Sequence, residues 1–290
     1  MKYEILPCTE DDADFIDEQA GQVINAFALT PEGNAEEEFV YQVTDREGRF
    51  LGGCVLAADE WKTAAIYALW VEEPYRRQGI ASALMREAER KARELGCRLA
   101  LIGTFDFQAK PFYDRHGYTL IAATRDYPKG HEHYFMQKRL DRNCGEAVPS
   151  GPCRYEIRPA GEEIAEELSK KLRQYDESCV PREHAYISLS KKVTDGNGTI
   201  VAGITGGVDG WNGTEIGSIW VDEPFRGQGI GSALLRAFEQ EAKDCGSHLL
   251  TVDPYDWNAA FFRKNGYVNV SGVLEDYPKG HTMYCMDKPL

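Results

Sequence analysis

The sequence lacks any apolar run close to the roughly 20 residues that a membrane-spanning helix needs. Its first residues reach the acidic segment 10–12 without the apolar core of a signal peptide. Both absences favour a cytoplasmic protein. Positive charge is also scarce, because 33 Lys and Arg stand against 47 Asp and Glu, for a formal net charge of −14. That field disfavours binding to the phosphates of a nucleic acid and suits a cationic partner such as an amine.

Metal-binding sequence patterns are missing as well. The eight cysteines are scattered without a CxxC pair, and the six histidines are not clustered at ligand spacing. We therefore predict no metal site and no disulfide. With 42% hydrophobic residues, the 290-residue chain has enough apolar material for two packed domains of ordinary size.

The chain contains an internal duplication with an offset of 150 residues. Segment 70–86 (WVEEPYRRQGIASALMR) matches segment 220–236 (WVDEPFRGQGIGSALLR) at 12 of 17 positions. The hexapeptide DYPKGH at 126–131 recurs unchanged at 276–281. A polar stretch at 142–153, with two Pro and two Gly, predicts a linker. We therefore expect a first domain at 1–141 and a second at 154–290.

Each copy predicts the same order of elements. In the first copy we expect a strand at 3–6 and a helix whose apolar residues include Phe15, Ile16, Val23, Ile24 and Phe27. Strands follow at 38–44, 49–58 and 64–71, then a helix at 79–95 that ends at a glycine. A buried strand at 98–102, a short helix at 109–116 and strands at 118–125 and 134–138 complete the copy. This order predicts an α/β domain with a mixed, mostly antiparallel sheet flanked by helices.

A glycine-bearing turn opens the long helix of each copy. The segments are RRQGIA at 76–81 and RGQGIG at 226–231, each preceded by a strand and a proline. The first N–H groups of a helix have no partner within the helix and lie at the positive end of its dipole. Glycine lets such a turn approach a ligand closely, so the segment suits a pyrophosphate. A dinucleotide fingerprint is excluded because the third glycine is missing, and a P-loop because no Gly-Lys-Ser/Thr follows.

With the motif Arg/Gln-x-x-Gly-x-Gly/Ala after a strand in both copies, the sequence resembles the GNAT superfamily of N-acetyltransferases, in a tandem two-domain form. The resemblance extends to Gln108-x-x-x-Phe112-Tyr113-x-x-x-Gly117-Tyr118 and to the related segment at 258–267. It implies acetyl-CoA as cofactor, with the turn on its pyrophosphate and the preceding strand end along its pantetheine arm. The residues so implied are Leu69, Trp70, Val71, Arg76, Arg77, Gln78, Gly79, Ile80, Ala81, Ser82 and Gln108 in the first copy, and Ile219, Trp220, Val221, Arg226, Gly227, Gln228, Gly229, Ile230, Gly231, Ser232 and Asn258 in the second.

The two copies differ at the position of the family's usual general acid. Tyr113 occupies it in the first copy, and Phe262, which has no hydroxyl, occupies it in the second. A phenol close to the departing sulfur can protonate the coenzyme A thiolate, and phenylalanine cannot. We therefore predict that the first domain is catalytic and that the second binds the cofactor but is catalytically degenerate.

A general base is not fixed by the sequence. The second copy has Glu215 near the start of a strand where the first has Ala65, and proximity alone can supply much of the rate. Glu72 and Asp222 are expected to be solvated surface residues. His131 and His281 are interpreted as part of a hairpin turn, with a role in the acceptor site as the alternative. Asn25 and its rough counterpart Asp176 are weaker candidates for acceptor contacts.

The function predicted is acetyl transfer from acetyl-CoA to the primary amine of a small molecule, by direct attack in a ternary complex. Polyamines, aminoglycoside-like compounds and amino-acid derivatives all fit an acidic protein. Three alternatives stay open: a sensor that binds acetyl-CoA without turnover, a protein lysine or N-terminal acetyltransferase, and a structural second half that exchanges last strands with the first. We expect a monomer with pseudo-twofold domains or a homodimer.

Overall fold

A computed structural model describes residues 3–28, 37–141 and 155–290 of the chain. Each copy has the predicted order of strand, helix, three strands, helix, strand, short helix and two strands. The boundaries differ from those predicted by a few residues at most element ends. The predicted linker, 142–153, lies outside the described residues.

The elements of the first copy are β1 (Ile5–Pro7), α1 (Glu10–Ala28), β2 (Glu37–Thr44), β3 (Phe50–Ala58), β4 (Thr63–Val71), the 3-10 turn η1 (Glu73–Tyr75), α2 (Ile80–Glu94), β5 (Leu99–Phe105), α3 (Lys110–Arg115), β6 (Thr119–Arg125) and β7 (Glu132–Arg139). Those of the second copy are β8 (Ile157–Ala160), α4 (Glu162–Cys179), β9 (Ile187–Thr194), β10 (Ile200–Val208), β11 (Gly213–Val221), η2 (Glu223–Phe225), α5 (Ile230–Asp244), β12 (Leu249–Val252), α6 (Ala259–Lys264), β13 (Asn269–Glu275) and β14 (Thr282–Pro289).

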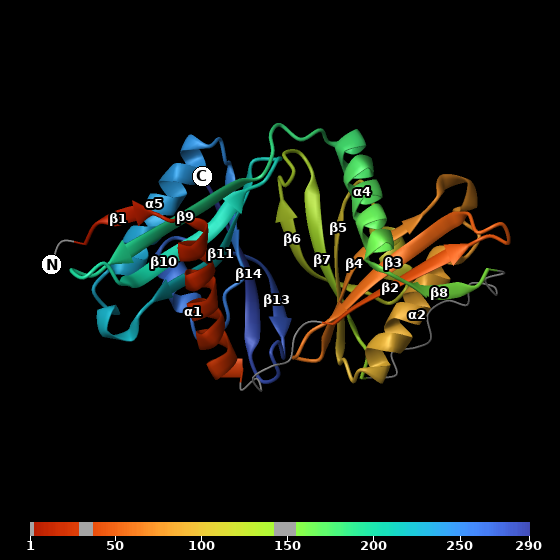
Figure 1. Ribbon diagram of the computed structural model, residues 1–290, viewed down its shortest axis with the longest axis horizontal. Coiled ribbons are helices and arrows are strands. Elements are labelled where there is room, and N and C mark those ends of the chain that lie inside the picture. Colours follow the sequence, from red (N-terminus) through yellow and green to blue (C-terminus); the bar gives the residue numbers. More distant parts are fainter. Residues whose placement is uncertain (1–2, 29–36, 142–154) are drawn as a thin grey trace. The chain divides into compact units, whose positions relative to one another are not determined.

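The described residues form two compact units, which we name after the copy that supplies most of each. Of the described residues, the first-copy unit contains 37–125, 131–141 and 155–181, and the second-copy unit contains 3–28, 126–130 and 182–290. The strand order is β6-β7-β5-β4-β3-β2-β8 in the former and β1-β9-β10-β11-β12-β14-β13 in the latter. Each unit therefore takes its outermost strand β8 or β1, and the helix after it, from the other copy (Figure 1).

The compact units thus do not coincide with the segments 1–141 and 154–290 that the duplication delimits. The exchanged elements are the first strand and helix of each copy. An exchange of last strands, which the sequence left open, is not what the structure shows within each unit. β7 pairs with β5 and β6 with β7, and β14 pairs with β12 and β13 with β14, all within their own copies. The two copies share the same apolar pattern, so the sequence alone does not specify which sheet a helix covers.

Helix α1 is anchored to the sheet of the second-copy unit by a strand pair and one buried side chain. β1 pairs antiparallel with β9, and Asp12 forms an ion pair with Lys192. Ile16 is fully buried, and a Cβ built on Gly203 of β10 would lie 2.1 Å from its Cδ1. A glycine is needed here because any larger residue would occupy the space of the isoleucine.

Helix α4 is anchored in the same way in the first-copy unit. β8 pairs antiparallel with β2, and Leu168 is fully buried. A Cβ on Gly53 of β3 would lie 3.0 Å from Leu168 Cδ1. β3 is buried along almost its whole length because α2 and α4 both pack on it. That double cover explains the unbroken apolar run of this strand.

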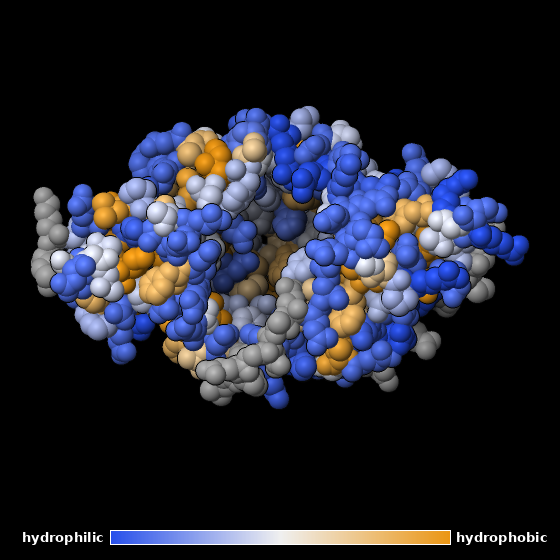
Figure 2. Space-filling view, viewed as in Figure 1, coloured by the Kyte–Doolittle hydropathy of each residue, from blue (hydrophilic) through white to orange (hydrophobic). Residues whose placement is uncertain are grey.

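The surface is mainly polar. The face drawn in Figure 2 is mostly hydrophilic, with hydrophobic residues in scattered groups. Within the described ranges, no helix is long and apolar enough to cross a membrane.

Candidate active site

In each unit, two parallel strands separate after a short paired stretch. β4 and β5 pair only from Thr63–Leu99 to Ala65–Leu101, although β4 continues to Val71 and β5 to Phe105. β11 and β12 also pair at three positions, the last being Glu215 with Thr251. Beyond these points, backbone groups of the strands are open to pairing with an extended ligand, as in β-strand addition.

A β-bulge lies beside each separation. In the first-copy unit Val55 pairs with Ala68 and Leu56 with Ile66, so that the register shifts by one residue at Tyr67 of β4. The second-copy unit has the same irregularity at Gly217. A bulge redirects backbone groups locally, which suits a position where a polar group of a ligand must be bound.

The glycine-bearing turns lie at the far end of the same strands. Gly79 and Gly229 both have φ of +83° and cap α2 and α5. Two residues earlier, Gly227 has φ of +76°, whereas the first copy has a residue with a side chain, Arg77, at φ of +60°. The left-handed region is costly for a side-chain residue, by roughly 1 kcal/mol, and almost free for glycine.

The residues before α2 and α5 are Gly79 and Gly229, and no side-chain hydrogen bond caps the first N–H groups of either helix. Arg76 and Arg226 hold each turn against its strand, since their Nε atoms donate to the carbonyls of Val71 and Val221 at 2.9 Å. The predicted pyrophosphate position is therefore a braced turn with open amides in both units.

The glutamines of the turns brace them further. Gln78 Nε2 donates to the carbonyl of Pro74 at 3.1 Å, and Gln228 Nε2 to that of Pro224 at 3.2 Å. Ser82 Oγ lies 3.0 Å from His116 Nε2, so its hydroxyl is bonded within the protein. The side chains predicted to contact the cofactor therefore shape the turn, and the backbone amides are the groups presented.

The strand ends predicted to line the cofactor have alternating environments. Leu69 and Val71 pack into the core beside α2, whereas Trp70 packs on the opposite face with residues of α4. The guanidinium of Arg76 lies 5.0 Å from the centre of the Trp70 ring, and Tyr175 of α4 contacts the same ring edge-on. In the second-copy unit Trp220 packs with Phe15 of α1 in the corresponding way.

Gln108 and Asn258 close the turns that follow β5 and β12. Gln108 Oε1 accepts from the backbone N–H of Phe105 at 2.9 Å, and Asn258 Oδ1 from that of Tyr255 at 2.8 Å. Gln108 Nε2 also donates to Asp176 of α4 at 2.6 Å. Both side chains thus fix the loop beside the strand separation.

Tyr113 is buried in the core of the first-copy unit, on the short helix α3. Its side chain lies edge-on to Phe112 and Tyr118. Burial, and then the neighbouring Cys54, raises the pKa of its phenol, so the hydroxyl stays protonated at neutral pH. A protonated phenol is the form that a general acid requires. Phe262 occupies the equivalent place in the second-copy unit and is likewise buried.

The second-copy unit has carboxyl groups at its strand separation. Glu215 is the last paired residue of β11, and Asp253 directly follows β12. Both side chains are accessible to solvent, yet enough protein surrounds them to raise their pKa values. Burial and then the charge of Glu215 raise the pKa of Asp253 to about 6. Aligning the two copies places Asp253 at the position of Gly103. This difference could have pointed to Asp253, but the sequence analysis did not use it.

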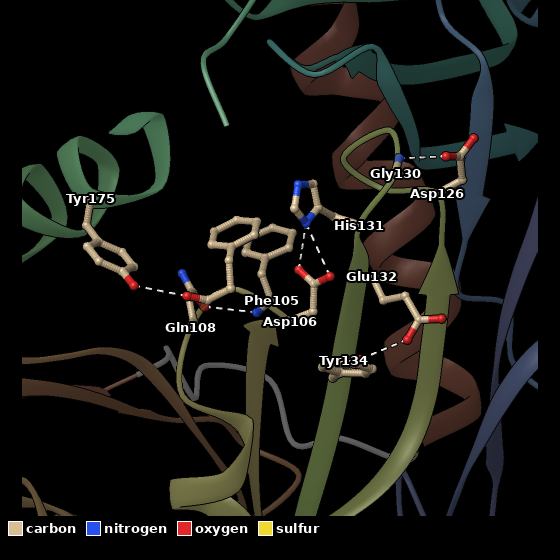
Figure 3. Close-up of polar contacts among 10 residues, drawn as sticks. Phe105, Asp106, Gln108, Asp126, Gly130, His131, Glu132, Tyr134 and Tyr175 are labelled. Carbon is tan, nitrogen blue, oxygen red and sulfur yellow. Dashed lines mark hydrogen bonds and ion pairs between the residues drawn. The ribbon is translucent and has the colours of Figure 1, made fainter. Parts of the chain in front are cut away.

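The other acidic and histidine candidates form local ion pairs, caps and turn contacts. Glu72 forms an ion pair with Lys171 at 2.7 Å, and Asp222 caps η2 through the N–H of the next residue. His131 Nδ1 lies 3.0 Å from Asp106 Oδ1 after the turn that joins β6 and β7 (Figure 3), and His281 has the same contact with Asp256. The turn interpretation of both hexapeptides is confirmed.

The exchanged helices lie on the face of each sheet opposite α2 or α5. In the second-copy unit Asp17 of α1 accepts from Thr205 Oγ1 at 2.6 Å, while Asn25 of the same helix is exposed. In the first-copy unit Tyr175 of α4 donates to the carbonyl of Phe107 at 3.0 Å. Each centre is therefore walled on one side by residues of the other copy.

Separated parallel strands, a bulge and a glycine turn at a helix start define an α/β enzyme of the acyltransferase class. Residues 7–118 and 153–267 match the model of the acetyltransferase (GNAT) family. The chain belongs to this family and is an N-acetyltransferase with two GNAT domains in tandem.

Similar proteins include single-copy and tandem members. The blasticidin-S acetyltransferase of Streptomyces morookaense is 33% identical over 128 residues, which cover 93% of that protein and 43% of this chain. The crystal structure of an acetyltransferase from Bacillus cereus ATCC 14579 is 36% identical and covers 47% of this chain and 96% of its own, with a TM-score of 0.43. A tandem GNAT protein from the clavulanic acid biosynthesis pathway is 16% identical and covers 99% of this chain and 98% of its own, with a TM-score of 0.41.

Proposed function

We propose that the acetyl donor is acetyl-CoA and that each unit has one site for it. The observation that carries this proposal is the uncapped, glycine-led helix start beside separated strands, present in both units. The turn amides would bind the pyrophosphate, and the free strand edge would pair with the amides of the pantetheine arm. The residues proposed are those at 69–71, 76–82 and 108 in the first copy and at 219–221, 226–232 and 258 in the second.

We further propose that the acceptor is the primary amine of a small molecule. The net charge of −14 attracts cationic acceptors. The relative that is 33% identical is named for its action on blasticidin S, which supports a small-molecule acceptor here. A cytoplasmic location, and a monomer or a homodimer, belong to the same proposal.

The reaction proposed for the first-copy unit is direct transfer. The amine nitrogen attacks the thioester carbonyl, the C–N bond forms and the C–S bond breaks. Tyr113 donates its phenolic proton to the coenzyme A thiolate and regains one through solvent. The phenol is protonated before the thiolate leaves, which is the form that this step requires.

The test of Tyr113 is the variant Tyr113→Phe, assayed by thiol release from acetyl-CoA across a panel of amines. Loss of a general acid lowers kcat by about 10²–10⁴-fold, with little change in the affinity for acetyl-CoA. Tyr118→Phe is the matched control, because its buried hydroxyl forms no hydrogen bond with the described residues. An undiminished kcat in Tyr113→Phe would remove the assignment.

The number of sites has its own test. Calorimetric titration should find two acetyl-CoA molecules per chain. Gly229→Val should abolish one of them and leave turnover intact, whereas Gly79→Val should abolish the other together with turnover, because both glycines have φ of +83°. A chain that binds no acetyl-CoA would contradict the proposed donor.

A second candidate is that the second-copy unit also transfers acetyl groups. Glu215 favours it, since a carboxylate at the strand separation can accept the proton of an amine. Residual turnover in Gly79→Val that disappears on adding Glu215→Gln would support this candidate. A peptide panel run beside the amine panel tests the alternative of a protein acceptor.

A further inference from the structure

A buried imidazole contacts a serine hydroxyl at the start of α2 in the first-copy unit. Ser82 Oγ lies 3.0 Å from Nε2 of His116, the residue that ends α3. His116 is only 6% exposed, and its ring centre lies 4.4 Å from that of Phe112. Packing therefore fixes the imidazole, and Ser82 lies half-buried beside it.

Ser82 is also one of the residues whose amides are open at the proposed pyrophosphate site. The first hydrogen bond of α2 runs from the N–H of Ala83 to the carbonyl of Gly79. The N–H groups of Ile80, Ala81 and Ser82 precede it and have no acceptor within the helix. The Ser82 hydroxyl is attached one carbon away from the last of these amides' residues, so it lies at the same helix start. A hydroxyl in this place can add a fourth donor to the three amides.

The direction of the bond between Ser82 and His116 decides whether the hydroxyl can donate elsewhere. Burial lowers the pKa of His116, so the imidazole is neutral at neutral pH and carries one proton. On Nε2 that proton has an acceptor, the Ser82 oxygen, whereas Nδ1 has no hydrogen-bond partner among the described residues. An N–H without an acceptor is costly inside a protein, which favours the proton on Nε2. The hydroxyl then accepts from the imidazole and keeps its own proton for another acceptor.

The second-copy unit has the serine without the imidazole. Ser232 takes the place of Ser82, and Asn265 takes the place of His116 before the glycine that follows the short helix. Asn265 Nδ2 donates to the carbonyl of Phe261 at 2.8 Å. The Ser232 side chain forms no hydrogen bond within the part of the chain that the structure describes. The same hydroxyl is therefore held in one unit and free to rotate in the other.

We propose that His116 is a positioning residue of the first-copy unit, which holds Ser82 Oγ so that its O–H donates to a pyrophosphate oxygen of the bound donor. This role rests on the acetyl-CoA site proposed above. The imidazole does not touch the reacting atoms and acts through the serine. A hydrogen bond to a charged phosphate oxygen is stronger than one between neutral groups, so a hydroxyl that is already oriented contributes to affinity.

The experiment measures the affinity of the first site for acetyl-CoA by calorimetry, in a chain that carries Gly229→Val so that only this site binds. Ser82→Ala should weaken binding by about 10–100-fold, because it removes a donor to a charged group. His116→Asn, which introduces the residue of the second copy, should weaken it by about 3–10-fold, because the hydroxyl loses its orientation. In turnover assays both losses should appear in KM for acetyl-CoA rather than in kcat.

A double-mutant cycle separates positioning from a general structural effect. If His116 acts through the serine, adding His116→Asn to Ser82→Ala should weaken binding no further. His116→Gln keeps an amide donor at about the reach of Nε2 and should retain the wild-type affinity within about 3-fold. If His116→Asn does not fold, His116→Leu takes its place, since leucine fills similar space without a donor.

The donor itself supplies a further comparison. The loss in Ser82→Ala should be as large for the acetyl ester of dephospho-coenzyme A, which keeps the pyrophosphate, and should vanish for S-acetylpantetheine, which has none. The matched control is Ser232→Ala in a chain that carries Gly79→Val. It should change the affinity of the second site by less than about 3-fold, because that hydroxyl is not oriented.

Four outcomes would overturn the proposal: an unchanged affinity in His116→Asn, additive losses in the double variant, equal losses from Ser82→Ala and Ser232→Ala, or a Ser82→Ala loss that is absent for the dephospho donor. If the wild type binds acetyl-CoA and these variants behave in one of those ways, only this inference fails. If the wild type binds no acetyl-CoA, the proposed function itself fails.

Discussion

Leu168→Ala, a substitution in the second copy, is expected to destabilise the first-copy unit. Leu168 belongs to the second copy but is fully buried in the sheet of the first-copy unit. The substitution removes three carbon groups, worth about 2.4 kcal/mol at about 0.8 kcal/mol each. The cavity left under α4 adds to this, for a total of about 2–5 kcal/mol. Native-state hydrogen exchange should show the loss in β3 and β4, which α4 covers.

The strands in which Leu168→Ala lowers hydrogen-exchange protection show which sheet α4 packs on. If each copy folded onto its own first helix, protection would fall in β10 and β11 instead, and the exchange would be refuted. Glu166→Ala, at an exposed position of the same helix, controls for changes in the helix itself and should change protection by less than about 0.7 kcal/mol. Ile16→Ala is the mirror experiment and should lower protection in β10 and β11 only.

Two further results are expected from ionisable groups. Lys138→Met should cost about 3–5 kcal/mol in denaturant unfolding, because the buried Glu89 would lose its buried partner at 2.7 Å and keep only the half-exposed Arg93 at 3.4 Å. Lys288→Met, at a more exposed pair of the second-copy unit, should cost clearly less; equal losses would contradict the argument from burial. Asp253 has a pKa raised from 3.8 to about 6 in the folded state, so the folded state holds this proton more tightly. Stability should therefore fall as pH rises from about 4 to about 6, and Asp253→Asn should flatten that part of a urea midpoint series; an unchanged slope would show that the carboxyl is not perturbed.

Local signals were sufficient for the elements and the turns. The glycines at 79 and 229 predicted where the long helices begin, and the structure places both in the left-handed conformation. The helix predicted from Phe15, Ile16 and Phe27 forms, but only Ile16 is fully buried. Phe27 is nearly half exposed and stacks on Trp257, an aromatic residue that lies far away in the sequence.

The groups at the strand separations were less predictable. Glu215 was visible as a difference between the copies, but its pairing with Thr251 at the last ladder position depends on the register of β11 and β12. The partner of Ser82 at the helix start was no more predictable, because His116 lies 34 residues away in the sequence. The hydroxyl and the imidazole become related only when the tertiary structure places α3 beside the start of α2.

By itself, the sequence determined that the chain is a duplication, that each copy has the GNAT order of elements, and that a glycine turn opens the long helix of each. These properties depend on backbone conformation and on short-range periodicity, which neighbouring residues dictate. The tertiary structure alone decided that β1 and α1 complete one sheet and β8 and α4 the other. Two nearly equivalent sheets offer the same apolar face to either helix, so the choice depends on packing between residues far apart in the chain, such as Ile16 on Gly203 and Leu168 on Gly53.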